Sequence, residues 1–145
     1  MPHVLLKKEE TVMQVNPYLF FDGQCEEAFK FYHQVLGGDL CAMMPFAGSP
    51  AEADVPPEWA TKIMHTQLTL DNWAIMGSDC PPGSYEMPKG FSVSLQIPDP
   101  DKAETIFQAL SEGGNIQMPL EKTFWAQRFG MAIDKFGIPW MINCE

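Results

Sequence analysis

The chain contains one pattern twice. Phe31 and the glycine pair at 37–38 recur 76 positions later as Phe107 and the glycine pair at 113–114. In both copies an apolar-periodic stretch leads into the glycines, and a short strand-like segment ending in Met-Pro follows them. A repeat of this length in 145 residues predicts two copies of one supersecondary unit. Two strand-rich units that cannot cover their own sheets must combine, and the groove between them is the natural place for a ligand.

Each copy predicts the same order of elements: a strand, a helix and three more strands. Alternating hydrophobicity predicts the strands, and apolar residues at helical spacing predict the helices. Asp99 is the expected N-cap of the second helix, with Pro100 at its first position. The expected strands are 12–21, 40–46, 62–70 and 73–77, then 91–97, 116–119, 123–134 and 138–144. The expected helices are 25–36 and the stretch from 100 to the second glycine pair.

These elements divide the chain into two modules within one structural domain. Residues 80–90 carry three prolines and two glycines, a composition typical of a connector. We therefore expect a first module at 13–80, a linker at 81–90 and a second module at 91–145. Residues 1–12 are expected to be a tail or an extra edge strand.

Charge and hydropathy exclude several partners. Nine basic and 19 acidic residues give a net charge of −10, which repels phosphate backbones and argues against nucleic acid as a partner. No apolar run approaches the roughly 20 residues that a membrane-spanning helix needs. The first ten residues lack the order of charges of a signal peptide. We expect a cytoplasmic protein with no membrane partner.

The four cysteines predict neither a zinc site nor a redox pair. Cys25, Cys41, Cys80 and Cys144 lie far apart, without a Cys-x-x-Cys motif. We expect reduced and mostly buried thiols.

Several short motifs, in order along the chain, resemble one known family. The motifs are residues 21–28 (Phe-Asp-Gly-Gln-Cys-Glu-Glu-Ala), 64–65 (Met-His), 76–79 (Met-Gly-Ser-Asp), 134–137 (Asp-Lys-Phe-Gly) and 140–142 (Trp-Met-Ile). Together they resemble the PhnB-like branch of the vicinal oxygen chelate superfamily, the glyoxalase, bleomycin-resistance and dioxygenase fold. The resemblance spans nearly the whole chain after Met13.

The resemblance implies an α+β fold of tandem βαβββ modules. They form a curved, partly open mixed sheet around a cleft, with the helices on the outer face. It also implies a homodimer, which is the commonest closed assembly. Some proteins of this branch carry a ubiquinone methyltransferase label. The sequence has no glycine-rich strand-to-helix turn of the type that an S-adenosylmethionine site uses.

The resemblance also locates the metal site of the superfamily enzymes. Their ligands come from the first strand of each module and from the closing strands, where the last ligand is normally a glutamate. Met141 falls at that glutamate, and Ser92 or Ser94 at a position where histidine is common. The first strand offers Gln14 or Asn16. Such side chains are poor ligands for Zn²⁺, Ni²⁺ or Mn²⁺, so we expect a degenerate metal site and no cofactor.

His65 is the one credible imidazole for a site. It lies on the polar face of a predicted strand, where it is a candidate general base or ligand hydrogen-bonding group. A structural role, bonded to a neighbouring strand or to Ser78 or Asp79, is equally open. A divalent metal, if bound, would use His65 with Glu121 or Glu145.

Uncharged polar faces on two strands from different modules predict the lining of a shared cleft. Strand parity places His65 and Gln67 on one such face and Ser92, Ser94 and Gln96 on the other. We expect residues 65, 92 and 94 to converge on one cavity. The full set of expected ligand-binding residues is Asn16, Gln67, Ser92, Ser94, Gln96, Trp125, Gln127, Arg128 and Met141.

Three functions are compatible with these features. The first is a small-molecule binding protein that has lost the metal site. The second is a metal-dependent lyase, isomerase or dioxygenase of glyoxalase type with an unusual ligand set. The third is a protein that sequesters a cationic antibiotic in an acidic groove.

Overall fold

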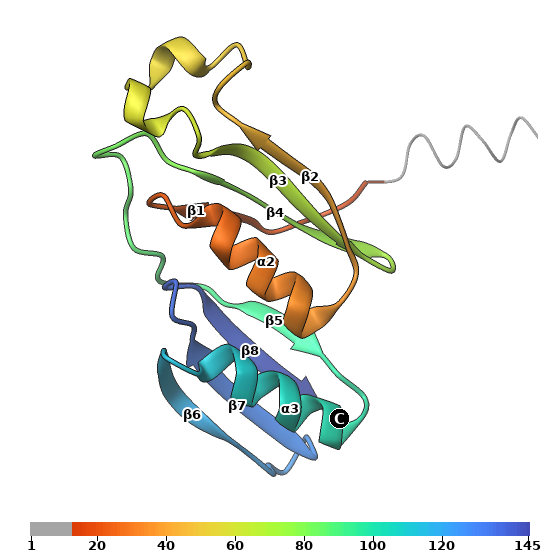
Figure 1. Ribbon diagram of the computed structural model, residues 1–145. Coiled ribbons are helices and arrows are strands. Elements are labelled where there is room, and N and C mark those ends of the chain that lie inside the picture. The colour runs from red at the N-terminus through yellow and green to blue at the C-terminus, as the bar shows by residue number, and fades with distance from the viewer. Residues whose placement is uncertain (1–12) are drawn as a thin grey trace, which may run out of the picture.

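The computed structural model describes residues 13–145, which form two modules of similar topology (Figure 1). Expectations for residues 1–12 lie outside the described residues. The first module contains β1 (Tyr18–Phe21), α2 (Cys25–Leu36), β2 (Asp39–Pro45), β3 (Ile63–Leu70) and β4 (Trp73–Asp79). Two short 3-10 turns, η1 (Glu52–Asp54) and η2 (Pro57–Trp59), lie between β2 and β3. The second module contains β5 (Val93–Gln96), α3 (Pro100–Ser111), β6 (Asn115–Glu121), β7 (Arg128–Ile133) and β8 (Pro139–Cys144).

Each module forms a four-stranded mixed sheet. The strand orders are β1-β4-β3-β2 and β5-β8-β7-β6. The pairs β1–β4 and β5–β8 are parallel, and the remaining pairs are antiparallel. Both helices lie on the same side of the sheets (Figure 1). The structure confirms the predicted α+β fold of tandem βαβββ modules, with its strands divided between two hydrogen-bonded sheets.

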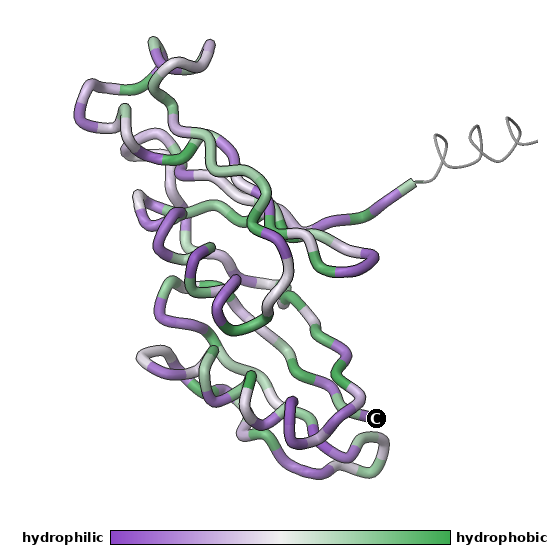
Figure 2. Tube along the Cα trace, turned by 45° about the vertical axis from the view of Figure 1, so that its right-hand side comes forward, coloured by the Kyte–Doolittle hydropathy of each residue, from purple (hydrophilic) through white to green (hydrophobic). Residues whose placement is uncertain are grey.

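The helices form where the sequence supplies an apolar face and end signals. In α2, Ala28, Phe29 and Tyr32 are buried, and the positive φ of Gly37 ends the helix. In α3, the carboxylate of Asp99 accepts a hydrogen bond from the backbone N–H of Asp101, which confirms the predicted N-cap. The outward faces of both helices are hydrophilic, as Figure 2 shows, so the apolar faces cover the sheets.

Two predicted strands begin several residues later in the structure. The strand expected at 123–134 begins at Arg128, because the Thr123 hydroxyl accepts hydrogen bonds from the backbone N–H groups of residues 125 and 126. Such local bonds give the backbone an alternative to a strand ladder. The strand expected at 12–21 begins at Tyr18.

A buried hydrogen bond joins the modules. The Tyr32 hydroxyl of α2 donates to the carboxylate of Asp134, which follows β7, over 2.5 Å. The Asp134 carboxylate also accepts hydrogen bonds from the backbone N–H groups of Phe136 and Ile138 and from the indole N–H of Trp140. The core is therefore continuous between modules. Across residues 13–145, no helix has the length and hydropathy that crossing a membrane requires.

Candidate functional site

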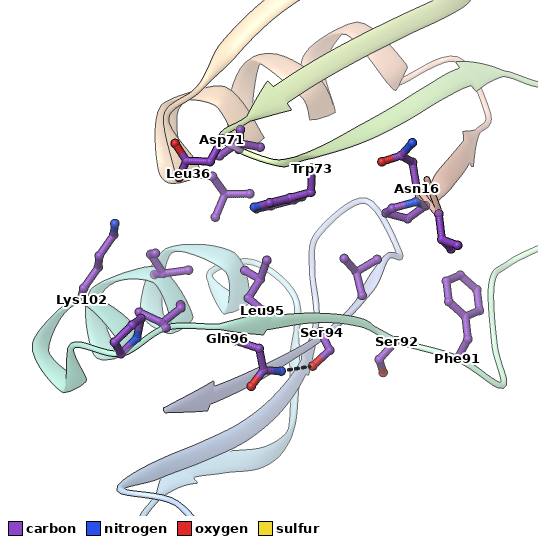
Figure 3. Close-up of a pocket in the computed structure, with 17 residues that line it drawn as sticks. Asn16, Leu36, Asp71, Trp73, Phe91, Ser92, Ser94, Leu95, Gln96 and Lys102 are labelled. Carbon is purple, nitrogen blue, oxygen red and sulfur yellow. Dashed lines mark hydrogen bonds between the residues drawn. The ribbon is translucent and has the colours of Figure 1, made fainter. Parts of the chain in front are cut away.

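A pocket of about 740 Å³ lies between the two modules (Figure 3). Its upper wall comes from the end of α2 and the β3–β4 hairpin, and its lower wall from β5 and the start of α3. The apolar lining includes Leu36, Trp73, Leu95 and Ile106. Both the volume and the apolar lining are typical of a site for a small organic molecule.

Strand β5 forms the floor because it is the edge strand of its sheet. Leu95 points up toward Trp73, whereas Ser92, Ser94 and Gln96 project from the opposite side of the strand (Figure 3). The Gln96 amide donates to the Ser94 hydroxyl over 3.1 Å. These three polar side chains therefore line the rim of the pocket rather than its centre.

Two opposite charges flank the apolar part of the pocket. Asp71, in the β3–β4 turn, and Lys102, in the first turn of α3, are exposed lining residues near the same end (Figure 3). Asp71 has a positive φ of 43°, a conformation that aspartate tolerates in tight turns. A ligand with a polar end group would meet both charges there.

His65 lies outside this pocket. It sits on β3, on the face of the first sheet away from α2, where its Nδ1 is 3.1 Å from the Tyr18 hydroxyl and the two rings stack. The pocket lining includes Ser92 and Ser94 but not His65. The expectation that residues 65, 92 and 94 converge on one cavity is therefore wrong for the single chain, because β5 turns its polar side away from the first sheet.

The Tyr18 contact determines what His65 offers a ligand. If the Tyr18 hydroxyl donates to Nδ1, a neutral imidazole carries its proton on Nε2 and presents a donor. If Nδ1–H donates to the phenol oxygen, Nε2 is the acceptor and can act as a base. Asp79 does not take part in this pair, since its buried carboxylate accepts the backbone N–H groups of Gly23, Cys25 and Ile63.

The structure places the other expected ligand-binding residues in four locations. Asn16 lines the pocket between the modules. Gln67 is next to His65 and donates to the Thr69 hydroxyl. Met141 lines a second hollow of about 490 Å³ on the second sheet, which also includes Ser92.

The fourth location is the end of the second sheet. Trp125 is exposed and packs edge-on against Phe129, while the Gln127 amide donates to the carbonyl of Glu145. Arg128 points to the helix side, where its Nε donates to Glu104 over 3.0 Å. None of these three side chains lines the pocket between the modules.

No divalent-metal cluster is formed by the part of the chain that the structure describes, as no three His, Cys, Asp or Glu side chains group together there. Neither expected pair, His65 with Glu121 or His65 with Glu145, belongs to a group of three such side chains among the described residues. Glu121 is exposed at the end of β6, and the Glu145 carboxylate accepts from Asn143.

Sequence reasoning missed Trp73 and Tyr18. Trp73 opens β4 directly after the Asp71–Asn72 turn, and such a hairpin end lies beside the other module only after the modules pack. Tyr18 alternates with the buried Leu19 and Phe21, so strand parity could have placed it on the His65 face.

The fold is that of the glyoxalase, bleomycin-resistance and dioxygenase superfamily. A solved family enzyme of that description from Burkholderia phytofirmans superposes with a TM-score of 0.60 at 13% identity, covering 89% of this chain and 95% of that one. A putative 3-demethylubiquinone-9 3-methyltransferase, PhnB protein, from Bacillus cereus gives a TM-score of 0.76 at 21% identity, with 92% and 100% coverage. At these identities the likeness shows the fold alone.

Residues 13–143 match the family model described as 3-demethylubiquinone-9 3-methyltransferase, and the chain belongs to this family. Protein YjdN of Escherichia coli is 34% identical over 139 residues, covering 90% of this chain and 95% of that protein. The crystal structure of protein PA1353 from Pseudomonas aeruginosa is 51% identical, with a TM-score of 0.85 and coverage of 92% and 98%. The predicted resemblance to the PhnB-like branch is confirmed.

Proposed function

We propose that this protein binds an organic small molecule in the pocket between its modules, without a resident divalent metal ion. The observation that carries the proposal is the pocket itself, whose volume of about 740 Å³ suits a drug-sized ligand. Its centre is apolar, and its polar rim carries hydroxyl and amide groups beside one acid and one base. A ligand with a hydrophobic body and a polar end fits this arrangement.

A thermal-shift screen of amphiphilic aromatic compounds tests the proposal. A ligand at 100 times its Kd stabilises the folded state by about 2.7 kcal/mol, which raises the Tm measurably. Trp73→Ala, inside the pocket, should abolish the shift, whereas Trp125→Ala, on the far loop, should retain it. Compounds that stabilise both variants equally would contradict binding in this pocket.

Metal content tests the second half of the proposal. Protein purified without chelator should contain well under one divalent ion per chain, because the expected ligand positions hold serine and methionine. A stoichiometric divalent ion that is lost in His65→Ala would overturn it.

A catalytic role is the alternative that one observation favours. His65 and Tyr18 form an accessible imidazole–phenol pair, the type of group that acid–base chemistry uses. A glyoxalase-type lyase, isomerase or dioxygenase should turn over hemithioacetal or catechol-like substrates only when metal is added. No turnover of these substrates with added metal would remove this alternative, and activity that survives in His65→Ala would remove the role of His65 in it.

Antibiotic sequestration is the second alternative, which the net charge of −10 favours. A cationic glycopeptide should then bind with an affinity that falls as salt rises. Undetectable binding at low salt would exclude it.

We also propose that the protein is a homodimer that pairs through the first sheet. The face away from α2 exposes Tyr18, Phe20 and Met44, large apolar side chains of a kind that interfaces cover. Sedimentation should give twice the chain mass, and Phe20→Glu should give the monomer. A wild-type monomer at micromolar concentration would contradict the proposal.

The cytoplasm remains the proposed compartment. The four cysteines are free thiols in the structure, as reducing conditions would keep them. Thiol counting on denatured protein from cells should find four per chain.

A further inference from the structure

Two opposite charges face the pocket between the modules at one of its ends. Asp71 comes from the β3–β4 turn of the first module and Lys102 from α3 of the second, and both line the pocket. Figure 3 shows the Lys102 side chain reaching from the lower wall toward the wall that carries Asp71. The two charges therefore come from different modules and face the same open space.

Neither charge is neutralised by a salt bridge within the described residues. Both salt bridges that residues 13–145 form use other side chains, namely Lys30 with Glu26 and Arg128 with Glu104. Asp99, which lies three positions before Lys102, accepts the backbone N–H of Asp101 instead. An acid and a base that line one pocket without pairing leave both charges available to a ligand.

The position of Lys102 on α3 directs its side chain to the pocket. Residues four apart lie on the same face of a helix, and Ile106, four positions after Lys102, is a buried lining residue. Lys102 itself is exposed, so its ammonium group stays in contact with water at the edge of the pocket.

An aromatic surface lies beside the charged end. Trp73 follows the Asp71–Asn72 turn, and Leu95 faces it from β5 (Figure 3). The indole nitrogen of Trp73 is turned toward the end where Asp71 and Lys102 lie, as Figure 3 shows. Because an indole N–H only donates hydrogen bonds, it adds to Lys102 as a partner for an anionic group.

We propose that the pocket binds a zwitterion with an aromatic body, in which an ammonium group and a carboxylate lie at one end, as in an aromatic α-amino acid. Asp71 contacts the ammonium group, and Lys102 contacts the carboxylate together with the indole N–H of Trp73. The inference rests on the proposed function, since it uses the same pocket, and it adds the chemical class of the ligand.

The charges of the protein discriminate against ligands with a single charge. The net charge of −10 repels an anionic ligand over the whole surface. A cationic ligand at Asp71 would meet the like charge of Lys102 at the same end of the pocket. A zwitterion carries no net charge and gains from both side chains.

Three indole compounds test the inference, because they share one aromatic body and differ only in charge. L-tryptophan carries both charged groups, tryptamine only the ammonium group and indole-3-propionate only the carboxylate. Isothermal titration calorimetry on the wild-type protein should give the highest affinity for L-tryptophan. The advantage over either other compound should be about threefold to fivefold, the effect of one partly solvated ion pair.

Two variants separate the roles of the acid and the base. Asp71→Asn keeps a residue that tolerates the positive φ of the turn, and it should weaken binding of L-tryptophan and tryptamine, but not of indole-3-propionate, by about threefold to fivefold. Lys102→Gln keeps a good helix former and should weaken binding of L-tryptophan and indole-3-propionate, but not of tryptamine. Lys122→Gln, at an exposed lysine outside the pocket, is the matched control and should change none of the three affinities.

The outcomes distinguish a failure of this inference from a failure of the proposed function. Equal affinities for the three compounds, or affinities that both charge variants leave unchanged, would overturn the zwitterion while loss of binding in Trp73→Ala would keep the pocket as the site. Binding that persists in Trp73→Ala would place the compounds elsewhere and overturn both. Undetectable binding of L-tryptophan at millimolar concentration would overturn this inference alone.

Discussion

The bond between Tyr32 and Asp134 connects the two modules, and Tyr32→Phe removes that bond alone. The ring keeps its edge-on contacts with Phe29 and Trp140, whose centroids are 5.6 and 5.2 Å away. Asp134 keeps three other donors, so no buried carboxylate is left unpaired. Only the phenol oxygen and its hydrogen bond disappear.

A hydrogen bond to a charged group contributes about 1.5–3 kcal/mol. We therefore expect Tyr32→Phe to lower the free energy of unfolding by about 2 kcal/mol, and the Tm by roughly 5 to 8 °C for a chain of this size. Asp134→Ala should be more damaging, because it leaves the Tyr32 hydroxyl, the Trp140 indole and two backbone N–H groups buried without an acceptor.

Urea unfolding followed by far-ultraviolet circular dichroism measures the effect. The midpoint should fall while the m-value stays constant. Tyr85→Phe is the matched control, because it deletes the same oxygen from a half-buried tyrosine in the linker between the modules. A loss for Tyr32→Phe within about 0.5 kcal/mol, the usual range of surface substitutions, would refute the role of this bond between the modules.

Three further predictions concern pH, backbone packing and capping. Burial, with the charge of Asp134, raises the pKa of Tyr32 well above 10, and burial likewise raises the pKa of the Cys25 thiol. Folding therefore favours the neutral forms of both groups, so the free energy of unfolding should be highest below about pH 8.5 and fall as the pH rises further. Above about pH 10 the fall should be less steep in Tyr32→Phe than in the wild type. Equal slopes of the two curves would contradict this prediction. Gly77→Ala should destabilise by about 2–3 kcal/mol in urea titrations, since the added Cβ would lie 2.6 Å from the Phe29 ring; a neutral result would show that the ring can move. Asp99→Ala should destabilise by about 1 kcal/mol through loss of the N-cap of α3, measurable as a lower Tm and restored by Asp99→Asn.

Element order was accessible to sequence reasoning because its signals are local. The first helix is observed as expected at residues 25–36, and the Asp99 cap is present. The strands expected at 12–21 and 123–134 begin later than predicted, because the side chains of Asn16 and Thr123 accept backbone hydrogen bonds before them. A pattern of alternating hydrophobicity does not show which acceptor forms a hydrogen bond with a given backbone N–H group.

Only part of the candidate site could be predicted from the sequence. Ser92, Ser94 and Gln96 of its lining were named from polarity and strand parity, and Asn16 from the resemblance to the superfamily. Trp73 and Lys102 were not, because their proximity depends on how the β3–β4 hairpin of one module approaches α3 of the other. Parity also could not show that β5 turns its polar side away from His65.

The sequence by itself determined the duplicated βαβββ order, the apolar faces of both helices and the family, since periodicity and end signals act over a few residues. The tertiary structure alone decided that the pocket is walled by a hairpin and an edge strand from different modules. That arrangement joins residues up to about ninety positions apart, and only the packing of one module on the other, fixed in part by Tyr32 and Asp134, brings them together.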